Sequence, residues 1–432
     1  MTAQHQSLPL ALYVHIPFCR FKCFYCDFNT YAGIENLIPD FVDALTTEIR
    51  RWREALTRAN ISPRTETIFF GGGTPSLLTP AQVEQILRTF TPKLDFRDDV
   101  EISMEVNPES VTRDFVRDVM SLGVNRFSMG AQSFDASELQ MLGRLHDAGG
   151  TERALNALRA GGADNVNLDL MYGLPRQTLK TWESSLTGAL KLTPEHLSLY
   201  ALTVEESTPF HGWVESGRLP SPDPDLAADM YEMAEQRMAQ AGLEQYEISN
   251  WAQAGHECRH NLAYWFNNRF LGFGPGAHSH LFGARFSAMR QPRGYIERMA
   301  ELSKQPLSDF NPLPPLEGPL DHADYINHIA PIDSVDPYTD FMIKAETLVL
   351  GLRLNRGVHE DGYAERFGAT PNTLFGPAIH ESIADGLLER INNESGETRD
   401  SALGERSDTT LRLTPRGRLL SNEVFVRIMS SA

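Results

Sequence analysis

The chain has 432 residues, of which 41% are hydrophobic and 22% charged, as in a soluble globular protein, and its length predicts one large domain with one or two smaller units. A formal net charge of −18 disfavours nucleic acid as a partner and allows at most peripheral contact with an anionic membrane. The sequence shows neither an apolar run long enough to span a bilayer nor a secretory signal, so we expect a cytoplasmic protein.

Short strand-like runs alternate with helical segments over the first half of the chain. The runs are residues 10–18, 67–72, 101–108, 126–133, 165–173 and 196–204. This alternation predicts βαβ units and a parallel sheet. Because no Gly-x-Gly-x-x-Gly turn follows the first run, we expect an α/β fold with a partial (β/α)6 barrel of the TIM type rather than a dinucleotide-binding domain.

Polar residues recur with period two in several of these runs. Ser103, Glu105 and Asn107 share one face of the third run, and Asn167 and Asp169 share one face of the fifth. A closed barrel normally fills its interior with aliphatic side chains. If the apolar faces pack against the helices, the polar faces point inward, which indicates a charged small molecule inside the barrel.

The pattern divides the chain into four parts. We expect the barrel core over 1–240, an extension over 241–300, a Pro-rich linker over 301–337, and a small C-terminal winged-helix-like α+β domain over 338–432. Helices are predicted at 225–241, 341–352 and 375–389. The polar segment 392–410 is predicted to be disordered.

Three of the four cysteines form a C-x3-C-x2-C loop that closes the first run: Cys19, Cys23 and Cys26. Thiolates bind iron–sulfur clusters, and three of them leave one iron of a [4Fe–4S] cubane open. An open iron of this kind is what radical S-adenosylmethionine (SAM) chemistry requires. The alternative is a zinc site with a fourth ligand such as His15, although the sequence lacks the second paired motif typical of zinc.

A glycine-rich turn, Gly71-Gly72-Gly73-Thr74-Pro75, ends the second run. Glycines allow backbone groups to approach a ligand closely, but a tight βα loop is an equally good explanation. Polar residues lie toward the ends of the later runs: Glu105, Gln132 and Asp169. Arg144 lies in the Gly143-Arg144-Leu145-His146 segment that follows the fourth run. Convergent polar groups at the active face of a barrel indicate a bound ligand.

Several motifs in one order resemble a known family. They are Tyr13-Val14-His15-Ile16-Pro17-Phe18-Cys19, the cysteine loop, Gly-Gly-Gly-Thr-Pro-Ser, Glu105-Val106-Asn107-Pro108, Gly130-Ala131-Gln132, Gly143-Arg144-x-His146 and Asp169-x-x-Tyr172-Gly173-Leu174-Pro175. Together they resemble the oxygen-independent coproporphyrinogen III oxidase (HemN-like) branch of radical SAM proteins. The resemblance implies that SAM is contacted by Tyr13, Gly72, Gly73, Thr74, Glu105, Gln132, Arg144, Asp169 and Ala201.

Within that branch the chain resembles the HemW-type heme chaperones. The oxidases have an N-terminal arm before the first strand and Gly-Cys after the last cluster cysteine, whereas here about a dozen residues precede Tyr13 and Asp27-Phe28 follow Cys26. His260-Asn261-Leu262-Ala263-Tyr264-Trp265 fits the H-N-x-x-Y-W signature of HemW-type proteins. The resemblance implies that His260, Tyr264 and Trp265 bind heme.

The resulting hypothesis is a heme chaperone with a [4Fe–4S] cluster, SAM and heme as its cofactors. Its expected partners are a heme donor, heme-recipient proteins and an electron donor for the cluster, and the sequence leaves a homodimer open. The alternatives are a true oxidase that decarboxylates coproporphyrinogen III and a SAM-dependent enzyme acting on another tetrapyrrole. Cys258, which alternates with His256 and His260, is a second candidate ligand for heme or for a metal.

Overall fold

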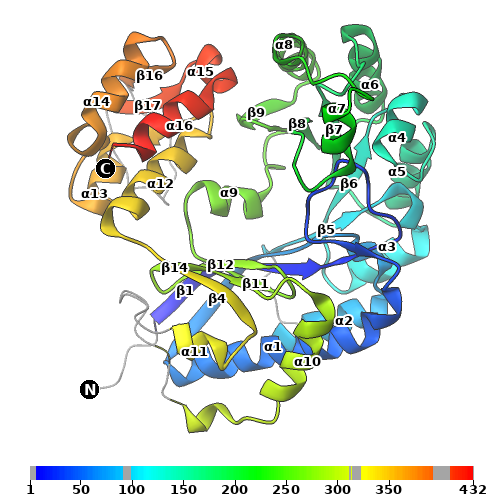
Figure 1. The fold of residues 1–432 in the computed structure, drawn as a ribbon, viewed down its shortest axis with the longest axis vertical. Helices are drawn as coiled ribbons and strands as arrows, with labels where there is room; N and C mark the ends of the chain where they lie inside the picture. Colours follow the sequence, from blue (N-terminus) through cyan, green and yellow to red (C-terminus); the bar gives the residue numbers. More distant parts are fainter. Residues whose placement is uncertain (1–5, 91–98, 311–312, 314–322, 393–408, 432) are drawn as a thin grey trace.

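The computed structural model describes residues 6–90, 99–310, 313, 323–392 and 409–431 (Figure 1). The core of the fold is a run of six parallel strands, and all six predicted strands are confirmed. They are β1 (Gln6–Ile16), β4 (Ile61–Gly72), β5 (Glu101–Val106), β6 (Arg126–Gln132), β7 (Val166–Tyr172) and β8 (His196–Ala201). This is the α/β partial barrel that the alternating pattern predicted.

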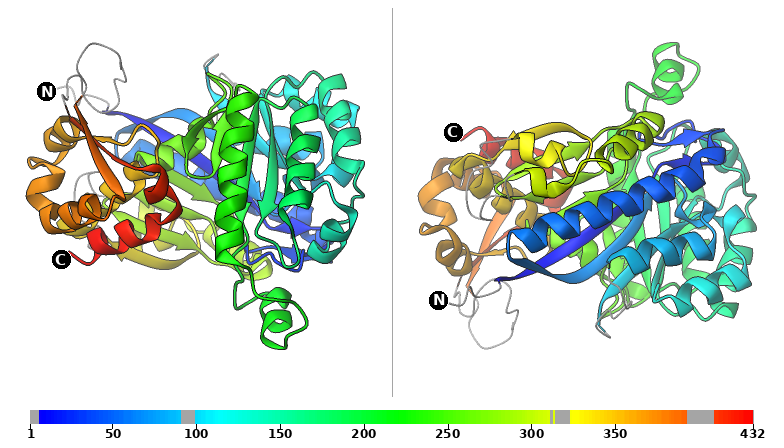
Figure 2. Two further views of the ribbon diagram at one scale, coloured as in Figure 1. Left: turned by 90° about the horizontal axis from the view of Figure 1, so that it is seen from above. Right: turned by 90° about the horizontal axis from the view of Figure 1, so that it is seen from below.

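Helices cover the outer face of the curved sheet (Figure 1). They are α1 (Ile38–Arg58), α2 (Pro80–Phe90), α3 (Arg113–Ser121), α4 (Ala136–Leu142), α5 (Gly150–Ala160), α6 (Leu179–Lys191) and α8 (Pro224–Gln240). The apolar residues of α1 that recur at helical spacing, Phe41, Leu45, Ile49 and Trp52, are all buried. The helices therefore take the apolar faces of the strands, which leaves the polar faces for the concave side. The short helix α7 (Pro209–Glu215) stands out from the barrel (Figure 2).

The sheet continues beyond β1 through an extension. This extension consists of β11 (Phe270–Phe273), β12 (His278–Leu281), β13 (Ala284–Ala288) and β14 (Ile332–Pro337). At the opposite edge of the sheet, β10 (Asn250–Ala252) and β9 (Glu244–Glu247) follow β8. Strand β11 is parallel to β1, and β12, β13 and β14 follow antiparallel. The end of the segment predicted as a Pro-rich linker is thus a strand of the main sheet, paired to β13. Sheet pairing with a distant hairpin, which local composition does not reveal, produces this strand.

A separate small domain closes the chain and lies at the end of the molecule opposite α3–α6 (Figure 2). Its elements are α12 (Asp340–Leu352), β15 (Val358–His359), α13 (Glu360–Phe367), α14 (Pro371–Ala384), β16 (Leu388–Asn392), β17 (Thr409–Leu413), α15 (Pro415–Leu419) and α16 (Ser421–Met429). The predicted helix 375–389 was wrong at its end: α14 stops at Ala384, and Gly386, with φ of +70°, leads into β16. Most of the segment predicted to be disordered, residues 393–408, lies outside the described residues.

In the parts of the chain that the structure describes, no helix is both long and apolar enough to cross a membrane.

Glu48 makes a buried polar contact that joins three elements. Its carboxylate accepts hydrogen bonds from the hydroxyl of Tyr295 on α10 (Pro292–Leu302) and from the N–H of Gly274, at 2.9 Å for the latter. Burial raises the pKa of Glu48 to about 7. As the pH rises, Glu48 therefore keeps its proton to a higher pH in the folded protein than in the unfolded chain. Its unfolding free energy should fall as pH rises from about 4.5 to about 7, and stay lower above that.

Replacing Glu48 with Gln should remove this dependence, because the amide cannot ionise. We expect the variant to exceed the parent protein in unfolding free energy at pH 8 by about 1–3 kcal/mol and to lose the advantage near pH 4.5. Denaturant unfolding across that pH range measures the effect, with Glu54→Gln, exposed on the same helix, as the control. Equal stability of Glu48→Gln and parent at both ends of the range would contradict the assignment.

Candidate functional site

The three cysteines of the motif lie on one loop at the carboxyl end of β1. Two short parallel strands, β2 (Phe18–Cys19) and β3 (Tyr31–Ala32), close the loop. Cys23 and Cys26 lie between them, and the N–H of Cys26 donates to the Cys23 carbonyl at 3.2 Å. All three cysteines are half-buried free thiols. The loop therefore presents three separate sulfur ligands within one short segment.

Polar side chains reach all three of these sulfurs, and Thr30 Oγ1 lies 4.0 Å from Cys26 Sγ. Thr74 Oγ1 donates to Cys19 Sγ and Arg144 Nη1 donates to Cys23 Sγ, both at 3.6 Å. Burial raises the pKa of Cys19 to about 11. Bound metal, rather than the protein alone, is therefore needed to hold this residue as a thiolate. Donors aimed at sulfur suit an anionic iron–sulfur cluster, because they stabilise its negative charge.

The zinc alternative does not fit this geometry. His15 Nε2 donates to the Asn29 carbonyl at 3.0 Å, so its Nδ1 accepts from the Tyr13 hydroxyl at 3.2 Å, and neither nitrogen is available to a metal. Within the described residues, no three His, Cys, Asp or Glu side chains are placed to hold a single ion. In a cubane each thiolate binds a different iron, so spaced thiols are suitable. The donor set fits a [4Fe–4S] cluster.

A cavity of about 400 Å³ occupies the barrel interior beside this loop, with Cys26 in its wall. We call it the barrel cavity. Five of the residues predicted to contact SAM line it: Tyr13, Glu105, Gln132, Asp169 and Ala201. Ser128, Asn167 and Ser198 line it as well, which confirms that the polar faces of the strands point inward.

The barrel cavity is lined by two half-buried carboxyl groups. Burial, and then the nearby Asp169, raise the pKa of Glu105 to about 8, and burial raises the pKa of Asp169. Both carboxylates would be stabilised by a cation between the strand ends. SAM carries a sulfonium and an ammonium group, so the charge of the lining fits SAM.

Two of the three glycines of the turn, Gly72 and Gly73, have different roles. Gly72 has φ of +105°, and a Cβ there would lie 2.4 Å from His15 Cε1, so a side chain is excluded. Its N–H donates to Glu105 Oε2 at 2.9 Å. Gly73 instead donates to the Ile16 carbonyl at 2.8 Å and lies against the backbone of the cysteine loop. Gly72 thus fixes the carboxylate of Glu105, which lines the barrel cavity, whereas Gly73 holds the cysteine loop in place.

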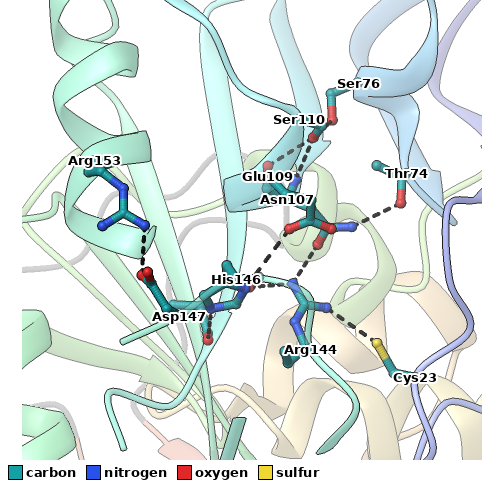
Figure 3. Close-up of polar contacts among 12 residues, drawn as sticks. Cys23, Thr74, Ser76, Asn107, Glu109, Ser110, Arg144, His146, Asp147 and Arg153 are labelled. Carbon is teal, nitrogen blue, oxygen red and sulfur yellow. Dashed lines mark hydrogen bonds and ion pairs between the residues drawn. The ribbon is translucent and has the colours of Figure 1, made fainter. Parts of the chain in front are cut away.

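Arg144 and Asn107 connect the cysteine loop to the strand ends (Figure 3). Arg144 Nη2 donates to Asn107 Oδ1 and to the Gly130 carbonyl, both at 2.7 Å, and Asn107 Nδ2 donates to Thr74 Oγ1 at 2.9 Å. Arg144 Nε is buried without a partner among the described residues, which leaves one donor for a ligand carboxylate. The sequence placed Asn107 on the polar face but assigned it no role. The position of Asn107 on the same strand face as Glu105 was the sequence feature that could have indicated its role.

A second cavity, of about 740 Å³, adjoins the first, and the two share five lining residues: Tyr13, Asp27, Phe28, Glu105 and Tyr264. We call it the outer cavity. On one side it is lined by Tyr264 and Trp265 of α9 (Arg259–Trp265). On the other side, β11, β12 and β13 contribute three aromatic or basic side chains and a hydroxyl: Phe270, His278, Arg285 and Ser287. Arg290 follows β13 at the same cavity.

His260, one of the three predicted heme residues, lies behind this wall and lines the barrel cavity instead of the outer one. Its side chain is 1% exposed, Nδ1 shares a hydrogen bond with Thr67 Oγ1 at 2.7 Å, and Nε2 shares one with the Tyr264 hydroxyl at 2.8 Å. Burial lowers the pKa of His260 to about 3. Both ring nitrogens are thus engaged, and His260 orients Tyr264. The indole N–H of Trp265 is buried without a partner among the described residues.

Cys258 is also buried, and it precedes α9. Its thiol donates to Glu101 Oε1 at 3.7 Å, and burial raises its pKa to about 12. The same carboxylate accepts from the backbone N–H groups of Arg259 and His260. The alternation of His256, Cys258 and His260 does not place them on one strand face, because α9 begins at Arg259 with Glu101 accepting from its first N–H groups.

The basic residues of the outer cavity were not predicted from the sequence. His278 and Arg285 come from different strands and meet only because β12 and β13 form a hairpin, in which His278 pairs with Ser287 and His280 with Arg285. Desolvation, followed by the charges of Arg285 and Arg290, lowers the pKa of His278. The only sequence feature that indicated a shared strand face here was the alternation of His278 with His280.

Comparison with known proteins identifies the family. Residues 13–187 match the Radical SAM superfamily, and residues 344–394 match the HemN C-terminal domain. The chain is 34% identical over 417 residues to the heme chaperone HemW of Bacillus subtilis (strain 168), covering 96% of this chain and 97% of that protein. The chain belongs to the HemW family. Membership of the radical SAM superfamily implies a [4Fe–4S] cluster and SAM, and the resemblance drawn from the motifs is confirmed.

Other relatives agree with the HemW assignment. The heme chaperone HemW of Synechocystis sp. (strain ATCC 27184 / PCC 6803 / Kazusa) is 37% identical over 359 residues, which cover 81% of this chain and 79% of that one. The solved structure of coproporphyrinogen III oxidase (HemN) from Escherichia coli superposes with a TM-score of 0.77, covering 100% of this chain and 92% of that chain at 21% identity. This HemW-family chain therefore has the HemN fold.

Proposed function

We propose that this chain is a heme chaperone that acts in the cytoplasm, binds heme and passes it to recipient proteins. The observation that carries the proposal is the outer cavity, which adjoins the space suited to SAM and combines aromatic and cationic side chains. Heme presents a flat apolar face and two carboxylates, so it needs both kinds of side chain. The name of the B. subtilis relative supports the same function.

We assign the residues as follows. The cluster is held by Cys19, Cys23 and Cys26, and SAM is contacted by Tyr13, Gly72, Gly73, Thr74, Glu105, Gln132, Arg144, Asp169 and Ala201. When reduced by an external electron donor, the cluster would supply the electron that cleaves SAM. Tyr264 and Trp265 form the aromatic wall for heme, and His260 contributes by holding Tyr264. Donor and recipient are proteins, since the charge of −18 disfavours nucleic acid.

A second candidate function is oxidative decarboxylation of coproporphyrinogen III. Its support is the shared lining of the two cavities, because a tetrapyrrole in the outer cavity would contact Tyr13 and Glu105, which also border the barrel cavity. The likeness to HemN adds only the fold, at 21% identity.

One experiment separates the two functions. The full chain is reconstituted anaerobically with iron and sulfide, reduced with SAM present, and given either coproporphyrinogen III or ferric heme. We expect one heme per chain with a dissociation constant of about 1 μM or below, transfer of that heme to a heme-free acceptor protein, and no protoporphyrinogen IX. Turnover to protoporphyrinogen IX would overturn the chaperone proposal in favour of the oxidase.

A further inference from the structure

The outer cavity offers one imidazole to a ligand. Two histidines line it, and both ring nitrogens of His15 are already hydrogen-bonded. His278 is exposed at the start of β12, and among the described residues its ring nitrogens have no hydrogen-bond partner. Iron prefers a neutral imidazole with an accessible nitrogen. His278 meets that condition, whereas His260 would first have to give up Thr67 or Tyr264.

Strand β13 and the residues that follow it supply the positive charges. Arg285 lies across the hairpin from His280 and is held by Glu346 at 3.0 Å. Arg290 is exposed at the cavity, and its backbone carbonyl is fixed by Asn29 Nδ2 at 2.9 Å. No acidic partner of the Arg290 side chain lies among the described residues. Arg290 is therefore the cation available to an incoming carboxylate.

The opposite wall carries an independent sign of a ligand. Trp265 lines the cavity, and its indole N–H is buried without a partner, which is uncommon for a buried donor. The ring itself is fixed from behind by Arg353, whose guanidinium lies 4.4 Å from its centroid. The volume of about 740 Å³ lies within the range of pockets that bind ligands of cofactor size.

We propose that His278 is the axial ligand of the heme iron and that Arg290, beside the fixed Arg285, binds a heme propionate. In this arrangement the porphyrin lies between the aromatic residues of α9 and the side of the β12–β13 hairpin that lines the outer cavity. The inference rests on the proposed function, and it moves the iron ligand from α9 to β12.

Ferric heme is the probe, and the full chain is titrated with it. His278→Ala should raise the dissociation constant at least tenfold and shift the Soret band, and added imidazole should restore the spectrum, because it replaces the missing ligand. His211→Ala, on the distant α7, is the control for loss of a histidine and should bind as the parent does. Circular dichroism and thermal unfolding verify that each variant is folded.

The propionate contact has its own test. Arg290→Ala should weaken heme binding about threefold to tenfold and should leave the binding of heme dimethyl ester, which lacks both carboxylates, unchanged. Arg293→Ala, exposed on α10, is the matched control.

Three outcomes would overturn the inference. A folded His278→Ala variant with the parental Soret band and affinity would remove the ligand assignment, although the proposed function would stand. Loss of the parental spectrum in folded His260→Ala, but not in His278→Ala, would place the iron at α9. Failure of the parent chain to bind heme at all would overturn both the proposed function and this inference.

Discussion

A single methyl group at position 73 is expected to destabilise the protein by about 2–4 kcal/mol and to abolish most of its cluster loading. A Cβ on Gly73 would lie 2.6 Å from the Phe18 carbonyl oxygen and 2.7 Å from that of Ile16. Both of these oxygens belong to the backbone, which cannot move aside as the end of a flexible side chain could. The same carbonyls accept the N–H groups of Gly73 and Thr74 at 2.8 Å, and Phe18 directly precedes the first cluster cysteine.

Gly73→Ala should therefore push the cysteine loop away from the turn and break the hydrogen bonds that align Cys19 with Thr74. Iron and sulfide per chain after anaerobic reconstitution, together with denaturant unfolding, measure the two effects. Gly212→Ala is the matched control, because that glycine is on the exposed helix α7 with nothing within 4 Å of the added methyl group, and it should change stability by less than about 1 kcal/mol. Full iron content and parental stability in Gly73→Ala would contradict the role given to this turn.

The parts of this molecule that the sequence predicts well are those with a local signal. Each parallel strand is a short apolar run followed by a helix, so the order of the barrel follows from periodicity. The three cysteines lie within eight residues of one another. Because these cluster ligands are so close in the sequence, they can be recognised without knowledge of the tertiary structure. Glu105 and Asp169 follow from the two-residue period of their strands, which places them inside once the helices take the other face.

The parts that the sequence does not predict depend on distant segments. Strand β14 exists because β13 pairs with it, across the segment that composition marks as a linker. The outer cavity is built from α9, the β12–β13 hairpin and α12, which are far apart in sequence. The H-N-x-x-Y-W signature drew attention to His260. The hydrogen bonds that it shares with Thr67 and Tyr264, which only the fold brings together, engage both of its ring nitrogens.

Arg144 is expected to set the reduction potential of the cluster as well as the shape of its loop. Its guanidinium donates to Cys23 Sγ, to Asn107 and to the Gly130 carbonyl, as Figure 3 shows for the first two contacts. A positive charge and an N–H···S bond stabilise the more negative, reduced form of a cluster. Removing both in Arg144→Met should lower the midpoint potential by roughly 60 mV, the one-electron equivalent of about 1.4 kcal/mol. Potentiometric titration followed by electron paramagnetic resonance measures the shift.

Arg144→Met should also destabilise the apo-protein by about 1–3 kcal/mol, because Asn107 Oδ1 and the Gly130 carbonyl lose their donor. Arg144→Lys retains the charge but cannot reach all three acceptors, so it should recover part of the potential and little of the stability. Arg153→Met is the control, since that arginine is exposed and pairs with Asp147 at 2.6 Å. If Arg144→Met carried a full cluster with the midpoint potential of the parent protein, Arg144 would act only structurally, by connecting Asn107 to the strand ends.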